Sequence, residues 1–581
     1  MMVRIWLLVI LSSFLFGEVL PGFISNKINQ YKFKKSELAI YIKETGKNRT
    51  IASLNIDKEM TPASVVKVYG AYAVLLELGY DYRWPTKFYY TGQLKDGIVT
   101  GDLVVKGYGD PELNTRDIPS IVSALKSKGI RKIKGNIIID RSYFTVPKQD
   151  SSHFDKNIYS AYNAMPDAMM FNQHTSRFSI VPKNGRHQVQ KSIPGESYRV
   201  SNTIKSVPGS CKGSRSWPSI KVDHSAETPT LMVSGKLSKH CKKRTHIYIV
   251  TKPYKEFYAA LIQEMKRSGI AFSGQMKVRK VPAGAKKVYT HYSPSLEKII
   301  STTSKKSNNL FARHLLLTLG AKIYGEPANL DKGRRAVVQI LNRYRLLDTP
   351  KCHIDNGCGL SRVSKITARS MANVLDHAYK NYGTRWMKTL SIAGQDGTIK
   401  RRFRSTIVKN RAWMKTGTLK NVKNISGYVK SQSGKLYTVV IMVNSKRAKY
   451  LGAKLQNDVM KWLVKYRGSG VSGELDPLPE ILKAKDDLWS DIDVGVPTSS
   501  YEKRSPEASS VKSYFVQVGS FSTSPDDRFL GKLRNSGFAY RIVKDQTLSK
   551  VMVGPYGKRA DAVRALKTLQ QQVKSAYVTQ L

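Results

Sequence analysis

The feature that most constrains this chain is a serine followed three residues later by a lysine, directly before an apolar segment. Residues 68–78 are apolar and Gly79 follows them, so we expect a helix that ends at this glycine. Thr61 can cap the N-terminus of that helix. Ser64 and Lys67 then lie on one face of its first turn. The pattern predicts a helix that presents a hydroxyl beside an amine.

A hydroxyl beside an amine indicates nucleophilic catalysis. A serine hydroxyl is a weak nucleophile until a base removes its proton, and a lysine can be that base when burial or a nearby cation lowers its pKa. The spacing alone is weak support, because Ser123 and Lys126 share it within an ordinary amphipathic pattern. We expect Lys126 to be a solvated surface charge. Two later motifs favour Ser64 and Lys67.

These two motifs follow in a fixed order. Ser307 and Asn309 form S-x-N at the start of a predicted helix over 310–319, and Lys415 begins K-T-G in a strand-like segment. The ordered set S-x-x-K, S-x-N and K-T-G is typical of penicillin-binding proteins and serine β-lactamases. The sequence therefore predicts an enzyme that catalyses acyl transfer through a serine nucleophile.

The charge of the chain restricts its partners. The chain has 581 residues and a formal net charge of +55. At about 150 residues per domain, this length predicts about four domains. So large a positive charge favours a polyanionic neighbour, which is nucleic acid, an anionic membrane or an acidic cell-wall polymer. No nucleic-acid-binding motif accompanies the charge, so we expect no nucleic-acid partner.

The N-terminus indicates export. One arginine and about a dozen apolar residues make 1–22 typical of a secretory signal peptide, and the apolar stretch is short for a spanning helix. We therefore expect the mature protein in the periplasm. Membrane association is expected only if this segment stays uncleaved as an anchor, and that alternative is open.

Export also changes the interpretation of the four cysteines. An even number of cysteines in an exported chain favours disulfides, and proximity in sequence favours Cys211–Cys241 and Cys352–Cys358. A zinc site is the alternative, but no spacing has the C-x-x-C form. We therefore expect two disulfides and no metal, and the predicted chemistry needs no organic cofactor.

The chain between the first two motifs is too long for a loop. Short strands and turns continue over about 190 residues, which without domains of their own would be unusual. We expect inserted, mostly β domains at 89–284, with a very basic nested module at about 165–250. The two parts of the catalytic domain are then 33–88 and 285–465.

Further motifs make the resemblance specific. Residues 106–111 are similar to an R-G-S-G-D-P segment, and 393–398 to A-G-x-D-G-[ST]. Residues 355–362 are similar to D-G-S-G-L-S-R, with one added residue and Cys358 in place of a serine. Over about residues 33–465 the chain resembles class C low-molecular-mass penicillin-binding proteins, the D-alanyl-D-alanine carboxypeptidases and endopeptidases of peptidase family S13 that are like penicillin-binding protein 4. The resemblance implies an α/β transpeptidase (penicillin-binding/β-lactamase-like) domain with inserted mostly β domains.

The resemblance also implies a role for each motif residue. Ser64 attacks the carbonyl of the penultimate D-alanine of a peptidoglycan stem peptide, and Lys67 accepts its proton. Ser307 relays that proton to the leaving amine, and Lys415 keeps Lys67 neutral. Asn309 orients the substrate amide. The rest of the third motif binds the substrate carboxylate and the oxyanion through Thr416, Gly417 and Thr418. β-Lactam antibiotics are expected as covalent inhibitors.

Two segments make up the C-terminal part. Residues 466–510 contain Gly, Pro, Ser and clustered acids with little periodicity, which is typical of a flexible linker. Residues 511–581 have the β-α-β-β-α-β order of an α+β domain and contain V-Q-V-G-S-F and V-G-P-Y, so they resemble a SPOR domain. SPOR domains bind peptidoglycan strands without stem peptides, notably at division sites.

This second resemblance assigns glycan binding to Gln517, Ser520 and Lys550. Gln517 and Ser520 are three residues apart, so ideal strand alternation puts them on opposite faces of a sheet. We expect a bulge near Gly519 that brings them to one face. The alternative is that Gln517 only satisfies backbone groups.

Other functions stay open at this point. A β-lactamase is disfavoured by the large insertion and the wall-binding tail. A catalytically inactive wall-binding scaffold is disfavoured by three complete motifs. The sequence does not separate a carboxypeptidase, which removes a terminal D-alanine, from an endopeptidase, which cuts a cross-link.

Overall fold

The computed structural model divides the chain near residue 477 into two compact units. The predicted signal peptide and linker lie largely outside the described residues. Within the described residues, no helix is long and apolar enough to cross a membrane. The structure describes residues 18–147, 159–195, 197–348 and 351–468, together with the strands, one helix and a few further positions between 514 and 580.

An antiparallel six-stranded sheet is the centre of the first unit, in the order β18-β19-β20-β21-β1-β2. Side chains alternate along each strand. On β1, Ala39 and Tyr41 therefore belong to one hydrophobic core, while Ile40 and Ile42 belong to another on the opposite face. The six strands are β1 (Leu38–Glu44), β2 (Thr50–Leu54), β18 (Ser391–Ile392), β19 (Ala412–Leu419), β20 (Val422–Lys430) and β21 (Leu436–Asn444).

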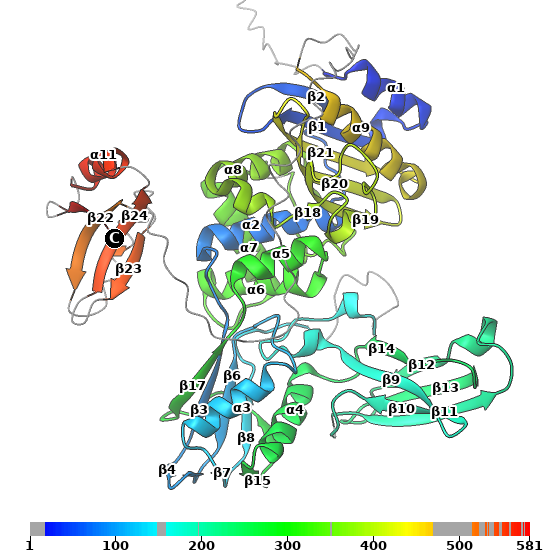
Figure 1. The fold of residues 1–581 in the computed structure, drawn as a ribbon, viewed down its shortest axis with the longest axis vertical. Coiled ribbons are helices and arrows are strands. Elements are labelled where there is room, and N and C mark those ends of the chain that lie inside the picture. The colour runs from blue at the N-terminus through cyan, green and yellow to red at the C-terminus, as the bar shows by residue number, and fades with distance from the viewer. Residues whose placement is uncertain are drawn as a thin grey trace, which may run out of the picture. The chain divides into compact units, whose positions relative to one another are not determined.

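Because both faces of this sheet are apolar, helices cover both (Figure 1). Helices α1 and α9 contribute to the core on one face, and an all-helical half covers the other. The helices of the first face are α1 (Gly22–Gln30) and α9 (Ala453–Lys465). Those of the helical half are α2 (Lys67–Leu78), α5 (Leu296–Lys305), α6 (Asn309–Tyr324), α7 (Leu330–Arg343) and α8 (Ala368–Met387).

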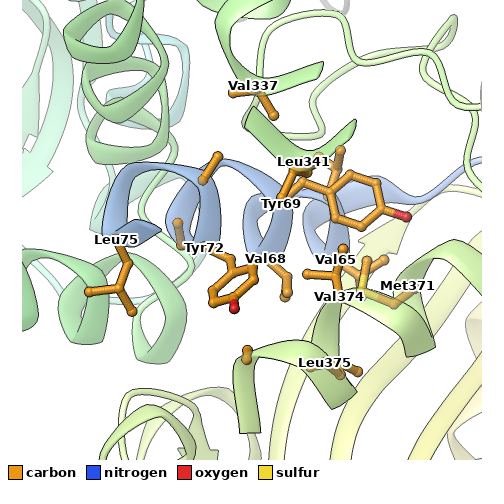
Figure 2. Packing of buried hydrophobic residues seen from close by; sticks show 14 of the residues in the cluster. Val65, Val68, Tyr69, Tyr72, Leu75, Val337, Leu341, Met371, Val374 and Leu375 are labelled. Carbon is orange, nitrogen blue, oxygen red and sulfur yellow. The ribbon is translucent and has the colours of Figure 1, made fainter. Parts of the chain in front are cut away.

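Helix α2 lies inside this helical half. Every residue from Lys67 to Leu75 is buried, which explains the continuous apolar run in the sequence. Figure 2 shows Tyr69 and Tyr72 among side chains from α7 and α8, including Leu341. The helix ends at Gly79, whose φ of 73° is a left-handed value that favours glycine. That part of the prediction is confirmed.

The start of α2 differs from the prediction. A short 3₁₀ turn, η2 (Ala63–Val66), precedes the helix, and no side chain caps it. Thr61 instead accepts a hydrogen bond from Lys365 Nζ at 3.2 Å, and its amide donates to Asn444 Oδ1 at 2.8 Å. Thr61 therefore joins the helix to the sheet rather than capping it.

The insertion begins with a second sheet, in the order β16-β8-β6-β3-β17. Its edge strand β17 pairs with β3, so the chain enters and leaves this body through neighbouring strands. Helices α3 (Ile118–Ser127) and α4 (Pro253–Arg267) pack into its core. The strands are β3 (Pro85–Tyr90), β6 (Leu103–Gly107), β8 (Ile137–Asp140), β16 (Met276–Val278) and β17 (Lys286–Tyr292). A small sheet beside it contains β4 (Leu94–Lys95), β5 (Ile98–Val99), β7 (Lys132–Ile133) and β15 (Ala271–Phe272).

The nested module consists of two three-stranded sheets around a small core of its own. The predicted disulfide Cys211–Cys241 is present in it, so this half of the cysteine prediction is confirmed. One sheet contains β9 (Ser176–Lys183), β10 (Arg186–Lys191) and β14 (Arg244–Tyr248). The other contains β11 (Arg199–Val207), β12 (Ser219–Asp223) and β13 (Thr230–Ser238).

The second unit contains an antiparallel sheet in the order β23-β24-β22-β25. Helix α11 (Arg559–Gln570) contributes to the core on one face, with Val551 and Val553. The strands are β22 (Tyr514–Phe521), β23 (Tyr540–Lys544), β24 (Ser549–Tyr556) and β25 (Tyr577–Gln580).

Candidate active site

The turn η2 presents Ser64 at the junction of the helical half and the sheet. Asn424, on β20, donates from Nδ2 to the carbonyls of Thr61 (2.8 Å) and Pro62 (2.9 Å), which fixes the chain just before the serine. Ala63 has a left-handed φ of 49°. A strained backbone held by side-chain hydrogen bonds is a common feature of functional sites.

Lys67 lies directly beside the serine. Its Nζ donates to Ser64 Oγ at 2.7 Å and to Asn309 Oδ1 at 2.8 Å, and also to the carbonyl of Cys358. The side chain is 1 % exposed. Burial, together with the nearby Arg313 cation, lowers the pKa of Lys67 to about 8, although Cys358 opposes the shift. The first and second motifs therefore meet at an amine that can be neutral close to physiological pH.

A second lysine and serine form the other half of the site. Lys415 Nζ donates to Ser307 Oγ at 2.9 Å and to the Thr416 carbonyl at 2.8 Å. Lys415 is fully buried, and burial together with the charge of Lys67 holds its pKa well below the usual range. Ser307 has a φ of 52°, left-handed like that of Ala63. Burial and mutual repulsion disfavour a positive charge on both lysines at once.

The rest of the K-T-G motif lies along β19. Thr416 Oγ1 donates to Thr398 Oγ1 at 2.8 Å, and Lys423 Nζ donates to Thr418 Oγ1 at 3.2 Å. Position 417 has no room for a side chain, because a Cβ there would lie 2.7 Å from the Pro62 carbonyl oxygen. The strand therefore approaches the serine turn closely, with a threonine on either side of the glycine.

A loop at 356–360 closes the site from a third direction. Asn356 Oδ1 accepts hydrogen bonds from the amides of Cys358 (3.1 Å) and Gly359 (3.3 Å). The Cys358 carbonyl is thereby directed at Lys67 and also accepts from Ser64 Oγ at 3.2 Å. Gly359 has a φ of 83°, and a Cβ there would lie 2.7 Å from the Ser64 amide. The D-G-S-G-like motif thus contributes backbone rather than side-chain groups.

The predicted disulfide Cys352–Cys358 is wrong. Both cysteines are free and buried. Cys352 Sγ donates to Ser370 Oγ at 3.2 Å, whereas Cys358 Sγ donates to Asn356 Oδ1 at 3.1 Å. The two thiols therefore have different partners, and a disulfide requires two side chains that approach each other.

The sequence prediction missed a contact from the insertion. Asn309 Nδ2 donates to the carbonyl of Tyr162 at 3.0 Å, and the buried Arg313 donates to that of Ala164 at 2.8 Å. Asn308 adds a bond to Gln173 Oε1 at 2.9 Å. A signal for this contact was Arg313, a cation inside a mostly apolar predicted helix. Residues of the insertion therefore support the S-x-N motif.

Two alternatives from the sequence remain to be compared with the structure: the second S-x-x-K spacing, at Ser123 and Lys126, and a metal site. Ser123 and Lys126 are both exposed on α3, whereas Ser64 is half-buried and Lys67 is buried. Among the described residues, no group of three or more histidines, cysteines or carboxylates is placed to hold a metal ion.

The residues assigned to glycan binding lie in the second unit. The register of β22 with β24 shifts between Gln517 and Gly519, so the expected bulge is present. Gln517 pairs with Met552, and Ser520 pairs with Lys550. Positions 550 and 552 share a face of β24, which places all three predicted residues on the face opposite the helical core.

Comparison with known proteins finds two family matches and several similar proteins. Residues 22–466 match the D-Ala-D-Ala carboxypeptidase 3 (S13) family, and residues 510–580 match the SPOR domain. The D-alanyl-D-alanine carboxypeptidase DacB of Haemophilus influenzae is 27 % identical over 446 residues, which cover 73 % of this chain and 89 % of that protein. A D-alanyl-D-alanine carboxypeptidase of Actinomadura is 23 % identical over 444 residues, covering 74 % and 81 % of the two chains.

A solved structure shows the same fold. The crystal structure of penicillin binding protein 4 (dacB) from Haemophilus influenzae aligns with a TM-score of 0.66 and 25 % identity, over 76 % of this chain and 99 % of that one. The same protein complexed with a β-lactam aligns with a TM-score of 0.61. The chain therefore belongs to the D-Ala-D-Ala carboxypeptidase 3 (S13) family, as a serine-type penicillin-binding D-Ala-D-Ala carboxypeptidase with a SPOR domain at its C-terminus.

Proposed function

We propose that Ser64 is the nucleophile and Lys67 its general base. The observation that carries this assignment is the 2.7 Å contact between Lys67 Nζ and Ser64 Oγ, made by an amine whose pKa is lowered to about 8. A base whose pKa lies near the working pH is both available and effective. Ser64 attacks the carbonyl of the penultimate D-alanine of a stem peptide, and water later hydrolyses the acyl-enzyme.

Ser307 and Lys415 complete the proton path in this proposal. Ser307 Oγ accepts a hydrogen bond from Lys415, so its own proton is free to pass to the leaving amine. Burial and the charge of Lys67 hold the pKa of Lys415 well below its usual range, and we assign to Lys415 the role of helping to keep Lys67 neutral. Asn309 bonds Lys67 and is placed to orient the substrate amide.

Substrate binding is assigned to β19. The backbone amides of Ser64 and Thr418 form the oxyanion hole, which stabilises the charge that develops on the attacked carbonyl. Thr416, held by Thr398, binds the terminal carboxylate together with Lys415. The close approach at Gly417 supports this role, because it brings the strand beside the serine turn.

Labelled penicillin tests the nucleophile directly. The wild-type protein should be labelled, and Ser64→Ala should lose labelling while its thermal melting stays close to that of the wild type. Ser123→Ala is the matched control, since it changes the exposed serine with the same spacing, and should be labelled fully. Labelling that persists in Ser64→Ala removes Ser64 from this role.

Muropeptide analysis separates the two activities. Mass spectrometry of muropeptides after incubation should show loss of a terminal D-alanine for a carboxypeptidase and loss of cross-linked dimers for an endopeptidase. We assign both activities to Ser64, because the substrate of each activity presents a D-Ala-D-X bond to the same nucleophile. Cleavage of either kind by Ser64→Ala would contradict that assignment.

The SPOR domain is assigned to wall targeting. Gln517, Ser520 and Lys550 share one face of its sheet and are proposed to bind glycan strands that have lost their stem peptides. The predicted signal peptide would export the enzyme to the periplasm, and binding of such strands would enrich it at the division site. Localisation of a fluorescent fusion, with and without residues 511–581, tests this part of the proposal.

A further inference from the structure

An exposed tryptophan stands out in the nested module. The side chain of Trp217 is 65 % exposed, although tryptophan usually buries most of its surface. Two side chains of β14 pack against its ring. The Arg244 guanidinium lies 5.1 Å from the ring centroid, and the centroid of the His246 ring lies 5.6 Å from it. His246 in turn stacks on the buried Phe178. The indole is therefore a supported platform with a free surface.

The segment before Trp217 is also fixed. Arg244 donates from Nη1 to the Ser216 carbonyl and from Nη2 to Cys211 Sγ, the latter at 3.4 Å. Cys211 is joined to Cys241 by the disulfide, three residues before Arg244. One arginine thus holds both the indole and the disulfide loop. An exposed aromatic kept rigid by a disulfide and a cation loses little conformational entropy when it binds a ligand.

Positive charge surrounds this platform. Lys212 and Arg215 lie just before Trp217 in the sequence, and Lys242, Lys243 and Arg244 directly follow Cys241. Neither 205–222 nor 230–250 contains a carboxylate. The module as a whole, 176–250, has fourteen lysines and arginines against three acidic residues.

We propose that this platform, formed by Trp217, Arg244 and the neighbouring lysines, is a second glycan-binding site that takes the carboxylate-bearing strand of peptidoglycan. The C–H face of a sugar ring stacks on the free indole surface, and the lysines bind the carboxylates of the polymer. This inference rests on the proposed function, which supplies the polymer. The site is on the catalytic unit itself, so it would hold the wall independently of the SPOR domain.

An anionic membrane is the competing occupant, and the surroundings of Trp217 disfavour it. Interfacial anchoring requires several apolar side chains that enter the bilayer together. The disulfide loop before Trp217 contains only glycine, serine, cysteine, lysine and arginine between 209 and 216. A single aromatic platform among cations suits an anionic sugar better than an acyl chain.

Pelleting of residues 18–468 with purified sacculi tests the site. This fragment is one compact unit and corresponds to 99 % of the solved Haemophilus relative, so it can be studied without the SPOR domain. Covering about 60 Å² of indole corresponds to about a tenfold change in affinity. Trp217→Ala should therefore weaken binding about tenfold, and Trp217→Phe should restore part of it.

Charge variants and controls complete the experiment. Lys212→Glu with Lys243→Glu should weaken binding most at low salt, because screening shortens the reach of exposed charges. Tyr292→Ala removes an aromatic of similar exposure, 58 %, from β17, outside the nested module, and should bind sacculi as the wild type does. Lys128→Glu with Lys134→Glu makes the same change in net charge elsewhere and should have a much smaller effect.

Two results would overturn the proposal. One is equal pelleting of the wild type and Trp217→Ala, when circular dichroism shows both folded. The other is binding to phosphatidylglycerol vesicles in place of sacculi, which would assign the surface to a membrane. Failure of the proposed function has a different signature, since it would remove penicillin labelling of Ser64 from the wild type without changing how that protein pellets.

Discussion

The pKa of Lys67 leads to a quantitative prediction for the pH dependence of acylation. Only the neutral amine can accept the proton of Ser64, so the rate should rise with pH through the pKa of Lys67. With a pKa of about 8, the neutral fraction is about one tenth at pH 7 and about nine tenths at pH 9. The acylation rate should therefore rise about tenfold between these two values and then level off.

An unshifted lysine would behave differently. With the ordinary pKa of 10.5, the neutral fraction would rise about a hundredfold from pH 7 to pH 9 and would not level off in this range. The second-order rate constant of acylation by labelled penicillin, measured from pH 6 to pH 10, distinguishes the two cases. A rate that is constant over this range, or that still rises tenfold per unit at pH 9, would refute the assignment of Lys67 as a base with a lowered pKa.

Arg313 provides the matched perturbation. Its charge is one of the causes that lower the pKa of Lys67, after burial. Arg313→Gln should therefore move the profile to higher pH and slow acylation at pH 7, whereas Arg313→Lys keeps the charge and should move it less. Thermal melting controls for loss of the bond to the Ala164 carbonyl. A profile that stays in place in Arg313→Gln would show that this charge does not act on the base.

Four further predictions concern backbone, burial, the thiol and the tail. Gly359→Ala should slow acylation at least a hundredfold, whereas Gly357→Ala, whose Cβ would meet only Leu316 atoms at 3.5 Å or more, should cost far less, as stopped-flow labelling would show. Burial raises the pKa of Glu256 to about 7, so the folded state loses stability as pH rises from 4.5 to 7. Glu256→Gln removes the cost of ionising this buried carboxyl, which is up to about 3 kcal/mol at pH 8. The variant should therefore have a higher melting temperature than the wild type at pH 8, and a much smaller difference at pH 4.5. Cys358→Ser should retain acylation, because the residue acts through its carbonyl, and thiol titration of the unfolded wild type should find two free thiols. Lys550→Glu should reduce pelleting of the full chain with amidase-treated sacculi, most strongly at low salt.

The parts of the fold that follow local rules could be predicted from the sequence. The apolar run after Lys67 and its stop at Gly79 predict the helix, and the alternation of polar and apolar residues around Gln517 predicts a strand. The bulge followed from assigning Gln517 and Ser520 to one face of that strand. Cys211 and Cys241 pair as expected from an exported chain. For the helix and the strand the information lies within a few residues, and for the disulfide it lies in the oxidising compartment that an exported chain enters.

The predictions that failed concern the direction of side chains. Cys352 and Cys358 are six residues apart, yet their thiols bond to Ser370 and to Asn356. Thr61 has the side chain of a capping residue, but its hydroxyl accepts a hydrogen bond from Lys365 and its amide donates to Asn444. Tertiary partners decide which way such groups turn, and a propensity read along the chain does not contain those partners.

The insertion is part of the catalytic architecture in a way that motif order alone does not reveal. The three motifs share one hydrogen-bonded site only because α6 begins where Asn309 can reach Lys67, and Asn309 is bonded on its other side to the carbonyl of Tyr162. Arg313, which lowers the pKa of Lys67, is held by the carbonyl of Ala164 in the same short segment. The electrostatic state of the base therefore depends on residues outside the transpeptidase motifs. A substitution that displaces residues 161–164 should consequently change the pH profile of acylation even though it replaces none of the motif residues.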